Sequence, residues 1–255
     1  NWAWEIDENT FDVIDVDFFT NHKFSTVINY ILFLFFLILK IAFIGSDIYT
    51  AIKLIVFDKW SSDITPFISY DICRWIFIGC ILLSVLLIVW NFIYGLKVYY
   101  TRNISLTYIN PIARNIYCLR SYKYFCVYNE ITSDNFFSGL VFFTYFKLRN
   151  CLGLICCDSP RQIINLITII KILKFDSSMV SVIKNIAATN KTEAIILSLM
   201  TFSFIIWFIF FIEFVYAILF FLPIYYRVVY KLKFKYGLKQ YCCIKINEVI
   251  QNKIQ

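Results

Sequence analysis

The sequence predicts an all-α integral membrane protein with about four transmembrane helices plus amphipathic or interfacial helices. Hydrophobic residues make up 60% of its 255 residues, and its mean hydropathy is +0.71. Soluble domains contain only about 45–50% apolar residues, so many of these side chains must face lipid. Only 6 Gly and 4 Pro interrupt the chain, which favours long helices. We expect residues 1–255 to form a single membrane domain.

The first two spans are expected at residues 27–57 and 75–100. The first segment is apolar over about 31 residues, which is roughly 46 Å of helix and exceeds a hydrocarbon core of about 30 Å. This helix must therefore tilt, bend or protrude. The second segment carries no charge before Lys97 and has aromatic residues at both ends. That pattern is typical of a helix whose ends lie at the two membrane–water interfaces.

The last span is expected at residues 194–229, and a basic tail, residues 230–255, follows it. The cytoplasmic flanks of spans are enriched in Lys and Arg, so this tail predicts a cytoplasmic C-terminus. Residues 101–135 are also basic, with four Lys or Arg against two acidic residues. If both basic stretches are cytoplasmic, an even number of spans separates them, and residues 136–157 supply the additional span. In this topology both termini are cytoplasmic.

An alternative places residues 136–157 on the cytoplasmic surface as an amphipathic helix, with Lys147 and Arg149 on anionic lipid. Hydropathy alone leaves both topologies open. In either topology a helix is expected from Ser159, as the N-cap, through Lys174, because Pro160 would occupy the first helical position.

Ionisable residues inside the apolar segments point to function, because a charge in lipid costs about 2.5–3.5 kcal/mol unless it has a partner or a water-filled path. Two such residues are carboxylates, and oxygen ligands suit hard cations, so we predict a cation pathway. Its candidate residues are Asp47, Glu213, Ser46, Tyr49, Thr50 and Asn91. The alternative is a structural ion pair between Glu213 and either Lys40 or Lys53 from another helix.

The tail after the last span has two candidate modes of membrane attachment. Its basic residues directly follow a span, so we expect them to contact anionic lipids and not nucleic acid. They are Arg227, Lys231, Lys233, Lys235 and Lys239. Cys242 and Cys243 lie close to this basic run and are candidates for palmitoylation. The alternative is that these cysteines, like the other seven, fill apolar space within helices.

The sequence contains no catalytic motif. Its single histidine, His22, precedes the first span, and there is no Walker loop, zinc-protease motif or glycine-rich dinucleotide turn. The nine cysteines lack the spacing of a metal site. We therefore predict that the protein is not an enzyme and that it has no cofactor and no resident metal.

Five stretches of the chain resemble the fungal low-affinity potassium transport family, plasma-membrane proteins linked to pheromone-regulated potassium influx. These stretches are Phe19–Tyr30, Ser46–Leu54, Asn103–Tyr108, Phe125–Asn129 and Asp158–Gln162. The resemblance implies a multi-pass plasma-membrane protein with four spans. It also implies potassium as the transported ion, moved by a channel or a carrier. No catalytic residue is implied.

The chain has no Thr-Val-Gly-Tyr-Gly filter, so potassium conduction would need another architecture. Four spans with few polar groups make a poor pore on their own, and we expect a homo-oligomer. The alternative function is a non-conducting membrane scaffold or regulatory subunit of another ion transporter. Because the first residue is Asn1 and not Met, we expect the natural protein to be longer.

Overall fold

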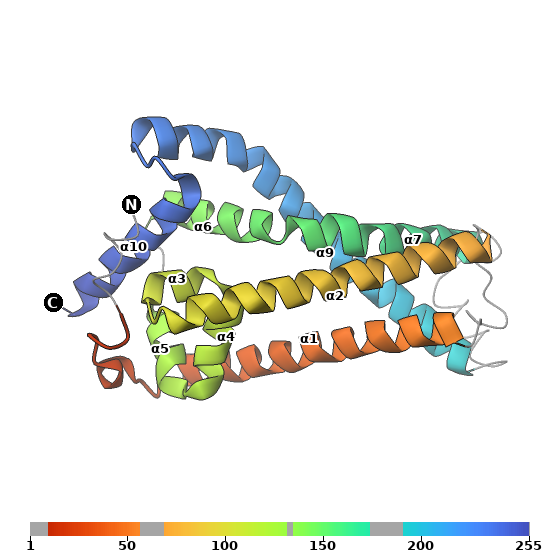
Figure 1. Cartoon of the computed structure of the whole chain (residues 1–255), viewed down its shortest axis with the longest axis horizontal. Helices are drawn as coiled ribbons and strands as arrows, with labels where there is room; N and C mark the ends of the chain where they lie inside the picture. The colour runs from red at the N-terminus through yellow and green to blue at the C-terminus, as the bar shows by residue number, and fades with distance from the viewer. Residues whose placement is uncertain (1–9, 57–68, 132–134, 174–190, 255) are drawn as a thin grey trace. The chain divides into compact units, whose positions relative to one another are not determined.

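The computed structural model describes residues 10–56, 69–131, 135–173 and 191–254, which are almost entirely helical (Figure 1). Within these ranges there is no β-strand, only an isolated bridge between Thr10 and Asn103. Three of the helices, or four if a bent pair counts as one span, are long and apolar enough to cross a membrane. These observations confirm the predicted all-α membrane fold.

Three long helices correspond to the first, second and last expected spans: α1 (Phe24–Val56), α2 (Tyr70–Tyr100) and α9 (Lys191–Tyr226). Few residues of their most apolar stretches are buried within the protein. The uncovered side chains include Phe36, Leu86 and Leu219. Such surfaces are favourable only in contact with lipid or with another protein.

The fourth expected span is broken. α6 (Phe136–Arg149) is followed by a π-helical turn, η3 (Gly153–Asp158), and by α7 (Ser159–Leu173). The helices at Phe136–Arg149 and Gly153–Ile170 meet at 47°, and together they have the length and composition of one broken span or of a re-entrant segment. The expected range 136–157 covers α6 and all but the last residue of η3, and whether it spans the membrane stays a prediction.

Ser159 is not an N-cap. Its backbone is helical, with φ −58° and ψ −45°, because the chain enters α7 directly from η3. The Ser159 hydroxyl instead donates to the carbonyl of Leu154 at 2.8 Å. Pro160 is tolerated here although the helix does not begin at it. The predicted helix start was wrong, whereas a helix does continue through Leu173.

The chain forms two compact units. Unit 1 comprises Asn1–Lys40, Ile88–Arg149 and Tyr216–Gln255, and unit 2 comprises Ile41–Leu87 and Asn150–Val215. The chain passes from one unit to the other four times, and α1, α2 and α9 each continue through a boundary. A single membrane domain remains a prediction.

Unit 1 contains three short helices where the sequence predicted only a basic loop: α3 (Ile104–Ile109), α4 (Pro111–Arg120) and α5 (Tyr122–Glu130). Each begins at a side chain that accepts a hydrogen bond from the first turn. These caps are Asn103, Asn110 and Ser121. The helices pack on an aromatic and aliphatic core that also includes the segment ending in η2 (Val16–Phe19).

The C-terminal helix, α10 (Gly237–Ile254), completes the core of unit 1. It packs against α3 and α6. Cys242, Cys243 and Ile246 are fully buried, with 0% exposure. Acylation of either thiol would require this core to open, which argues against the predicted palmitoylation and favours the alternative of buried fillers.

Burial also suppresses the chemistry of these thiols. It raises the pKa of Cys243 to about 12 and the pKa of Cys242 well above its usual value. A raised thiol pKa keeps the group protonated, and only the thiolate is an effective nucleophile. We expect a maleimide at neutral pH to leave both thiols unmodified in the folded protein and to modify them after denaturation, as read by peptide mass spectrometry. Gln251→Cys, on the exposed face of α10, is the labelled control.

Ion pairs at the surface of unit 1 connect its separate segments. Glu130, at the end of α5, accepts from the Asn21 amide at 3.1 Å and also pairs with Lys253 of α10. Arg102 pairs with Asp12 at 2.6 Å. Exposed pairs of this kind stabilise a protein by only about 0–1 kcal/mol each. They nevertheless show that the N-terminal segment and α10 lie on the same helical cluster.

Candidate functional site

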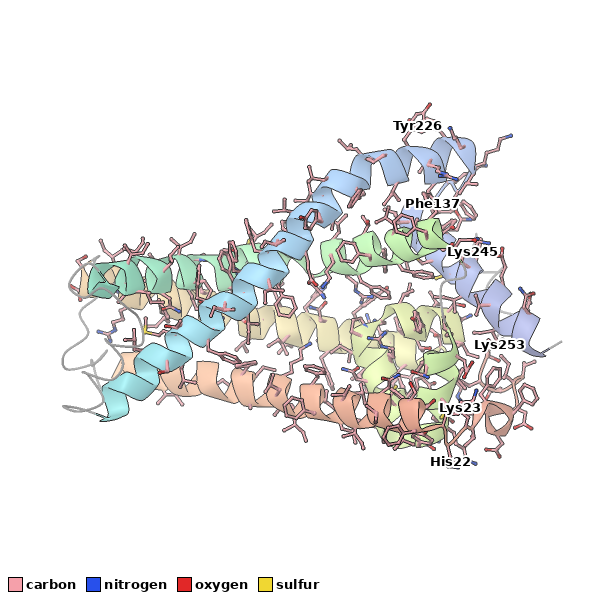
Figure 2. All side chains as sticks on the ribbon, turned by 180° about the vertical axis from the view of Figure 1, so that it is seen from behind. His22, Lys23, Phe137, Tyr226, Lys245 and Lys253 are labelled. Atoms are coloured by element: carbon pink, nitrogen blue, oxygen red, sulfur yellow. The ribbon has the colours of Figure 1, made fainter. Side chains whose placement is uncertain are left out.

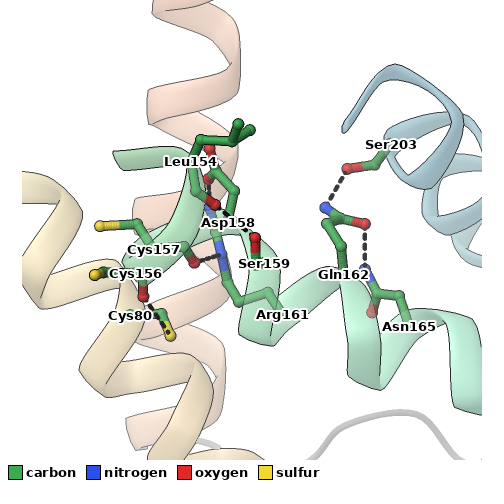
Figure 3. A network of polar contacts seen from close by, with 10 residues as sticks. All are labelled: Cys80, Leu154, Cys156, Cys157, Asp158, Ser159, Arg161, Gln162, Asn165 and Ser203. Atoms are coloured by element: carbon green, nitrogen blue, oxygen red, sulfur yellow. Dashed lines mark hydrogen bonds and ion pairs between the residues drawn. The ribbon is translucent and has the colours of Figure 1, made fainter. Parts of the chain in front are cut away.

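A polar network occupies η3 and the start of α7 in unit 2 (Figure 3). The Arg161 guanidinium donates from Nε to the carbonyl of Cys157 at 3.2 Å and pairs with Asp158 at 2.9 Å. The Cys80 thiol of α2 donates to the carbonyl of Cys156 at 3.7 Å. Side-chain donors therefore bind backbone carbonyls of the π-helical turn. Such turns are often found at functional positions within helices.

The network continues across to α9. Gln162 donates to the Ser203 hydroxyl at 2.8 Å, and its own carbonyl oxygen accepts from Asn165 at 3.3 Å (Figure 3). One turn further along α7, the Thr168 hydroxyl donates to the carbonyl of Ile164. Arg161, Gln162, Asn165 and Thr168 are all buried. A row of buried polar side chains thus follows one face of an otherwise apolar helix, and we call it the α7 polar face.

Two physical roles suit the α7 polar face. Hydrogen bonds between helices in a bilayer contribute about 0.6 kcal/mol on average, so the network holds α7 against α9. Polar and ionisable groups inside spans also mark ion pathways. Amide and hydroxyl oxygens of Gln162, Asn165 and Ser203 are hard ligands of the type that alkali cations prefer. The Arg161–Asp158 pair adds no net charge.

The structure describes the side chains of only two of the six residues in the predicted cation pathway. Ser46, Asp47, Tyr49 and Thr50 lie on α1, but their side chains are outside the described part of the chain. Glu213 is half-buried on α9 in unit 2. Asn91 is exposed on α2 in unit 1. The pathway therefore stays a prediction.

The predicted structural ion pair also stays a prediction. Lys40 is exposed on α1 in unit 1, whereas Glu213 belongs to unit 2. The side chain of Lys53 is outside the described residues. Within the described ranges no cluster of three or more His, Cys, Asp or Glu could hold a metal ion.

Arg149 contacts protein groups, whereas the alternative with residues 136–157 on the membrane surface placed its side chain on anionic lipid. Its guanidinium donates to the carbonyl of Ile109 at the end of α3 and lies 6.0 Å from the ring centre of Tyr94. Lys147 lies 5.8 Å over the ring of Phe143. Arg149 is thus bound by the protein itself.

The basic residues of the tail are placed in two groups. Arg227, Lys231, Lys233 and Lys235 are exposed, whereas Lys239 is half-buried on α10. The first group follows α9 in a second π-helical turn, η4 (Arg227–Lys231), and in the residues after it. Their contact with anionic lipid remains a prediction.

Sequence reasoning missed the α7 polar face, although a signal was present. Asp158, Arg161, Gln162, Asn165 and Thr168 recur at intervals of three and four residues, which places them on one face of a helix. In the sequence analysis, Asp158–Gln162 supports a helix start and a family resemblance but no polar face. The partner Ser203 has no comparable signal, because it depends on how α9 packs.

The long apolar helices, the broken span and the polar groups buried between them define a multi-pass α-helical membrane protein. Residues 10–249 match the family described as fungal potassium channel, and the chain belongs to this family. The predicted resemblance is thereby confirmed.

Two yeast proteins are similar to the chain. It is 39% identical over its whole length to the Saccharomyces cerevisiae protein named low affinity K(+) transporter 1, of which it covers 54%. It is 40% identical, over 78% of its length, to pheromone-regulated membrane protein 6 of the same yeast, of which it covers 63%. The chain thus spans about half to two thirds of these curated relatives. No solved structure matches it.

Proposed function

We propose that this protein carries potassium into the cell across the plasma membrane with low affinity, as a channel or a carrier. The observation that carries the proposal is membership of the fungal potassium channel family over residues 10–249. The name of the yeast relative that matches the whole chain supports it. The structure adds helices able to span a membrane and a buried polar face of the kind that also lines ion pathways.

The topology we propose has four spans and cytoplasmic termini. The residues before α1, the basic stretch 101–131 and α10 are all parts of unit 1. The short helices of this cluster lie at one membrane surface, where α6 also begins, and their Lys and Arg content favours the cytoplasm. An even number of crossings then separates α5 from α10, so α6 and α7 together make one broken span and α9 the other.

Potassium is proposed to follow the α7 polar face, together with Asp47 and Glu213. Gln162→Leu removes the amide that joins Asn165 to Ser203 and leaves an apolar side chain of similar length. We expect the loss of these two hydrogen bonds, worth about 0.6 kcal/mol each, and of the amide oxygen as an ion ligand to lower flux about fivefold or more. Asp47→Asn and Glu213→Gln, made separately, test the predicted carboxylates in the same way.

The measurement is potassium efflux from loaded liposomes that contain the purified protein. Gly79→Ala is a matched control, because Gly79 lies on α2 with nothing within 4 Å of an added Cβ. Unchanged flux in both carboxylate variants would remove Asp47 and Glu213 from the path, and unchanged flux in Gln162→Leu would do so for the α7 polar face.

The non-conducting scaffold is the second candidate, and one observation favours it. Gln162, Asn165 and Ser203 bond to one another, as they would in a purely structural clamp. Well-folded protein that gives no flux above empty liposomes would favour this alternative.

A further inference from the structure

Four cations stand together where the last span ends. We call residues 227–235 the basic loop; it contains Arg227, Lys231, Lys233 and Lys235, all of them exposed. The α9 span itself ends at Lys231. Among the described residues, none of the four forms an ion pair with a carboxylate. Their positive charge is therefore available to a partner outside the chain.

The backbone of the basic loop is fixed on the core of unit 1. Val228 is fully buried there, and the Phe234 amide donates to the Val228 carbonyl at 3.2 Å. Between these anchors Lys233 adopts a left-handed conformation with φ 59°. Non-glycine residues adopt this conformation only where the surroundings impose it. The buried Val228 and the half-buried Phe234 thus hold the backbone of the loop, and the cations beside them are exposed.

An apolar groove lies on the start of α6, which is also part of unit 1. It has a volume of about 340 Å³ and is lined by Asn135, Phe136, Gly139, Leu140 and Phe143 of the start of α6. The Arg227 guanidinium lies 4.2 Å over the ring of Phe137, the immediate neighbour of a groove residue. Figure 2 labels Phe137 on the start of α6 and Tyr226 at the end of α9, the residue before Arg227.

Aromatic side chains surround the cations. Tyr226 and Tyr230 pack with ring centres 5.1 Å apart, and both are exposed. Tyrosine is enriched at the level of lipid headgroups, where its ring contacts apolar chains and its hydroxyl contacts water. The basic loop therefore has the composition of a surface at the membrane–water interface.

We propose that the basic loop and the groove on α6 form a binding site for an anionic phospholipid. The phosphate and carboxylate of the headgroup bind the cations of the basic loop, and one acyl chain lies in the groove against Phe136, Leu140 and Phe143. A lipid fits both halves, because it joins a negative headgroup to an apolar chain. A soluble acidic partner would use the cations and leave the groove empty.

Native mass spectrometry of the purified full chain in neutral detergent tests the site with phosphatidylserine and phosphatidylcholine as probes. We expect phosphatidylserine to bind at least tenfold more tightly. Each basic residue near an anionic surface contributes about fivefold, so Lys231→Gln with Lys235→Gln is expected to weaken phosphatidylserine binding about 25-fold. Lys23→Gln with Lys97→Gln removes the same charge from exposed positions elsewhere and leaves binding unchanged.

A groove variant separates the lipid from a free anion. Gly139→Phe fills the groove and is expected to weaken phosphatidylserine binding without changing the effect of inorganic phosphate as a competitor. Equal binding of the two phospholipids, equal loss in both lysine double variants, or no effect of Gly139→Phe would each overturn the proposal. Displacement of phosphatidylserine by soluble polyglutamate at low concentration would show an acidic protein surface to be the partner.

Discussion

Replacing Arg161 with leucine is expected to lower the melting temperature of the protein by roughly 4–12 °C. The variant loses the bonds to the Cys157 carbonyl and to Asp158, and it removes the guanidinium charge that pairs with that carboxylate. Removing one partner from a fully buried ion pair costs about 3–5 kcal/mol. The Asp158 side chain is 44% exposed, so we expect about 2–3 kcal/mol here. One kcal/mol corresponds to roughly 2–4 °C for a chain of this size.

The melting temperature is measured on detergent-purified protein. Samples are heated to a series of temperatures, and the folded protein that remains is quantified by size-exclusion chromatography. The double variant Asp158→Asn with Arg161→Leu removes both charges and is expected to recover part of the loss, since no unpaired carboxylate remains. A single variant as stable as the parent protein would mean that the pair does not hold the π-helical turn.

Gly95→Leu is expected to have the second large effect, through packing instead of charge. A Cβ at residue 95 of α2 would lie 2.5 Å from the Cβ of Ile112 and 2.6 Å from its Cγ2. Ile112 is β-branched and close to the backbone of α4, so it cannot turn away without moving the helix. Overpacking of this kind costs about 1–3 kcal/mol, and a full leucine side chain falls at the upper end.

The matched control is Gly79→Leu on the same helix, where nothing lies within 4 Å of an added Cβ. Leucine is a better helix former than glycine by about 1 kcal/mol, so this variant is expected to be as stable as the parent protein or slightly more stable. Equal melting temperatures for the two variants would contradict the close approach of α2 and α4.

The long helices were predictable because lipid imposes a simple condition on them. Helices α1, α2 and α9 need only an apolar stretch of sufficient length, and the hydropathy of consecutive residues shows such a stretch directly. The break between α6 and α7 was not predictable in the same way. A π-helical turn depends on the side chains of Arg161 and Cys80 reaching carbonyls of η3, and hydropathy carries no information on such bonds.

The short helices of unit 1 had helix signals in their sequences, but the basic composition of this stretch made a loop the expected structure. Asn110 followed by Pro111 is a typical helix start, yet the surrounding Lys and Arg led us to expect a loop. In α10, Leu238, Cys242 and Ile246 recur every four residues and mark a buried face within a tail that is basic overall. What no sequence signal supplies is the choice of partner, here α3 and α6.

The candidate site was predictable only in kind. Polar groups inside the apolar segments were expected, with Asp47 and Glu213 foremost, but the network at η3 and α7 is built on Arg161, Gln162 and Asn165. A charged residue within an apolar segment can be recognised from the linear sequence alone. A network that joins two helices depends on their rotation about their own axes, which is fixed by packing.

The burial of α10 has a consequence for the order in which the protein is made. A ribosome releases α10 after α3, α6 and α9, so the apolar faces of α3 and α6 have no cover until residues 237–254 have been made. A polypeptide that stops after the last span would keep those faces open to water and to quality-control proteases. Helix α10 thus acts as a late cover for α3 and α6, and the core of unit 1 closes only after α9 has been synthesised.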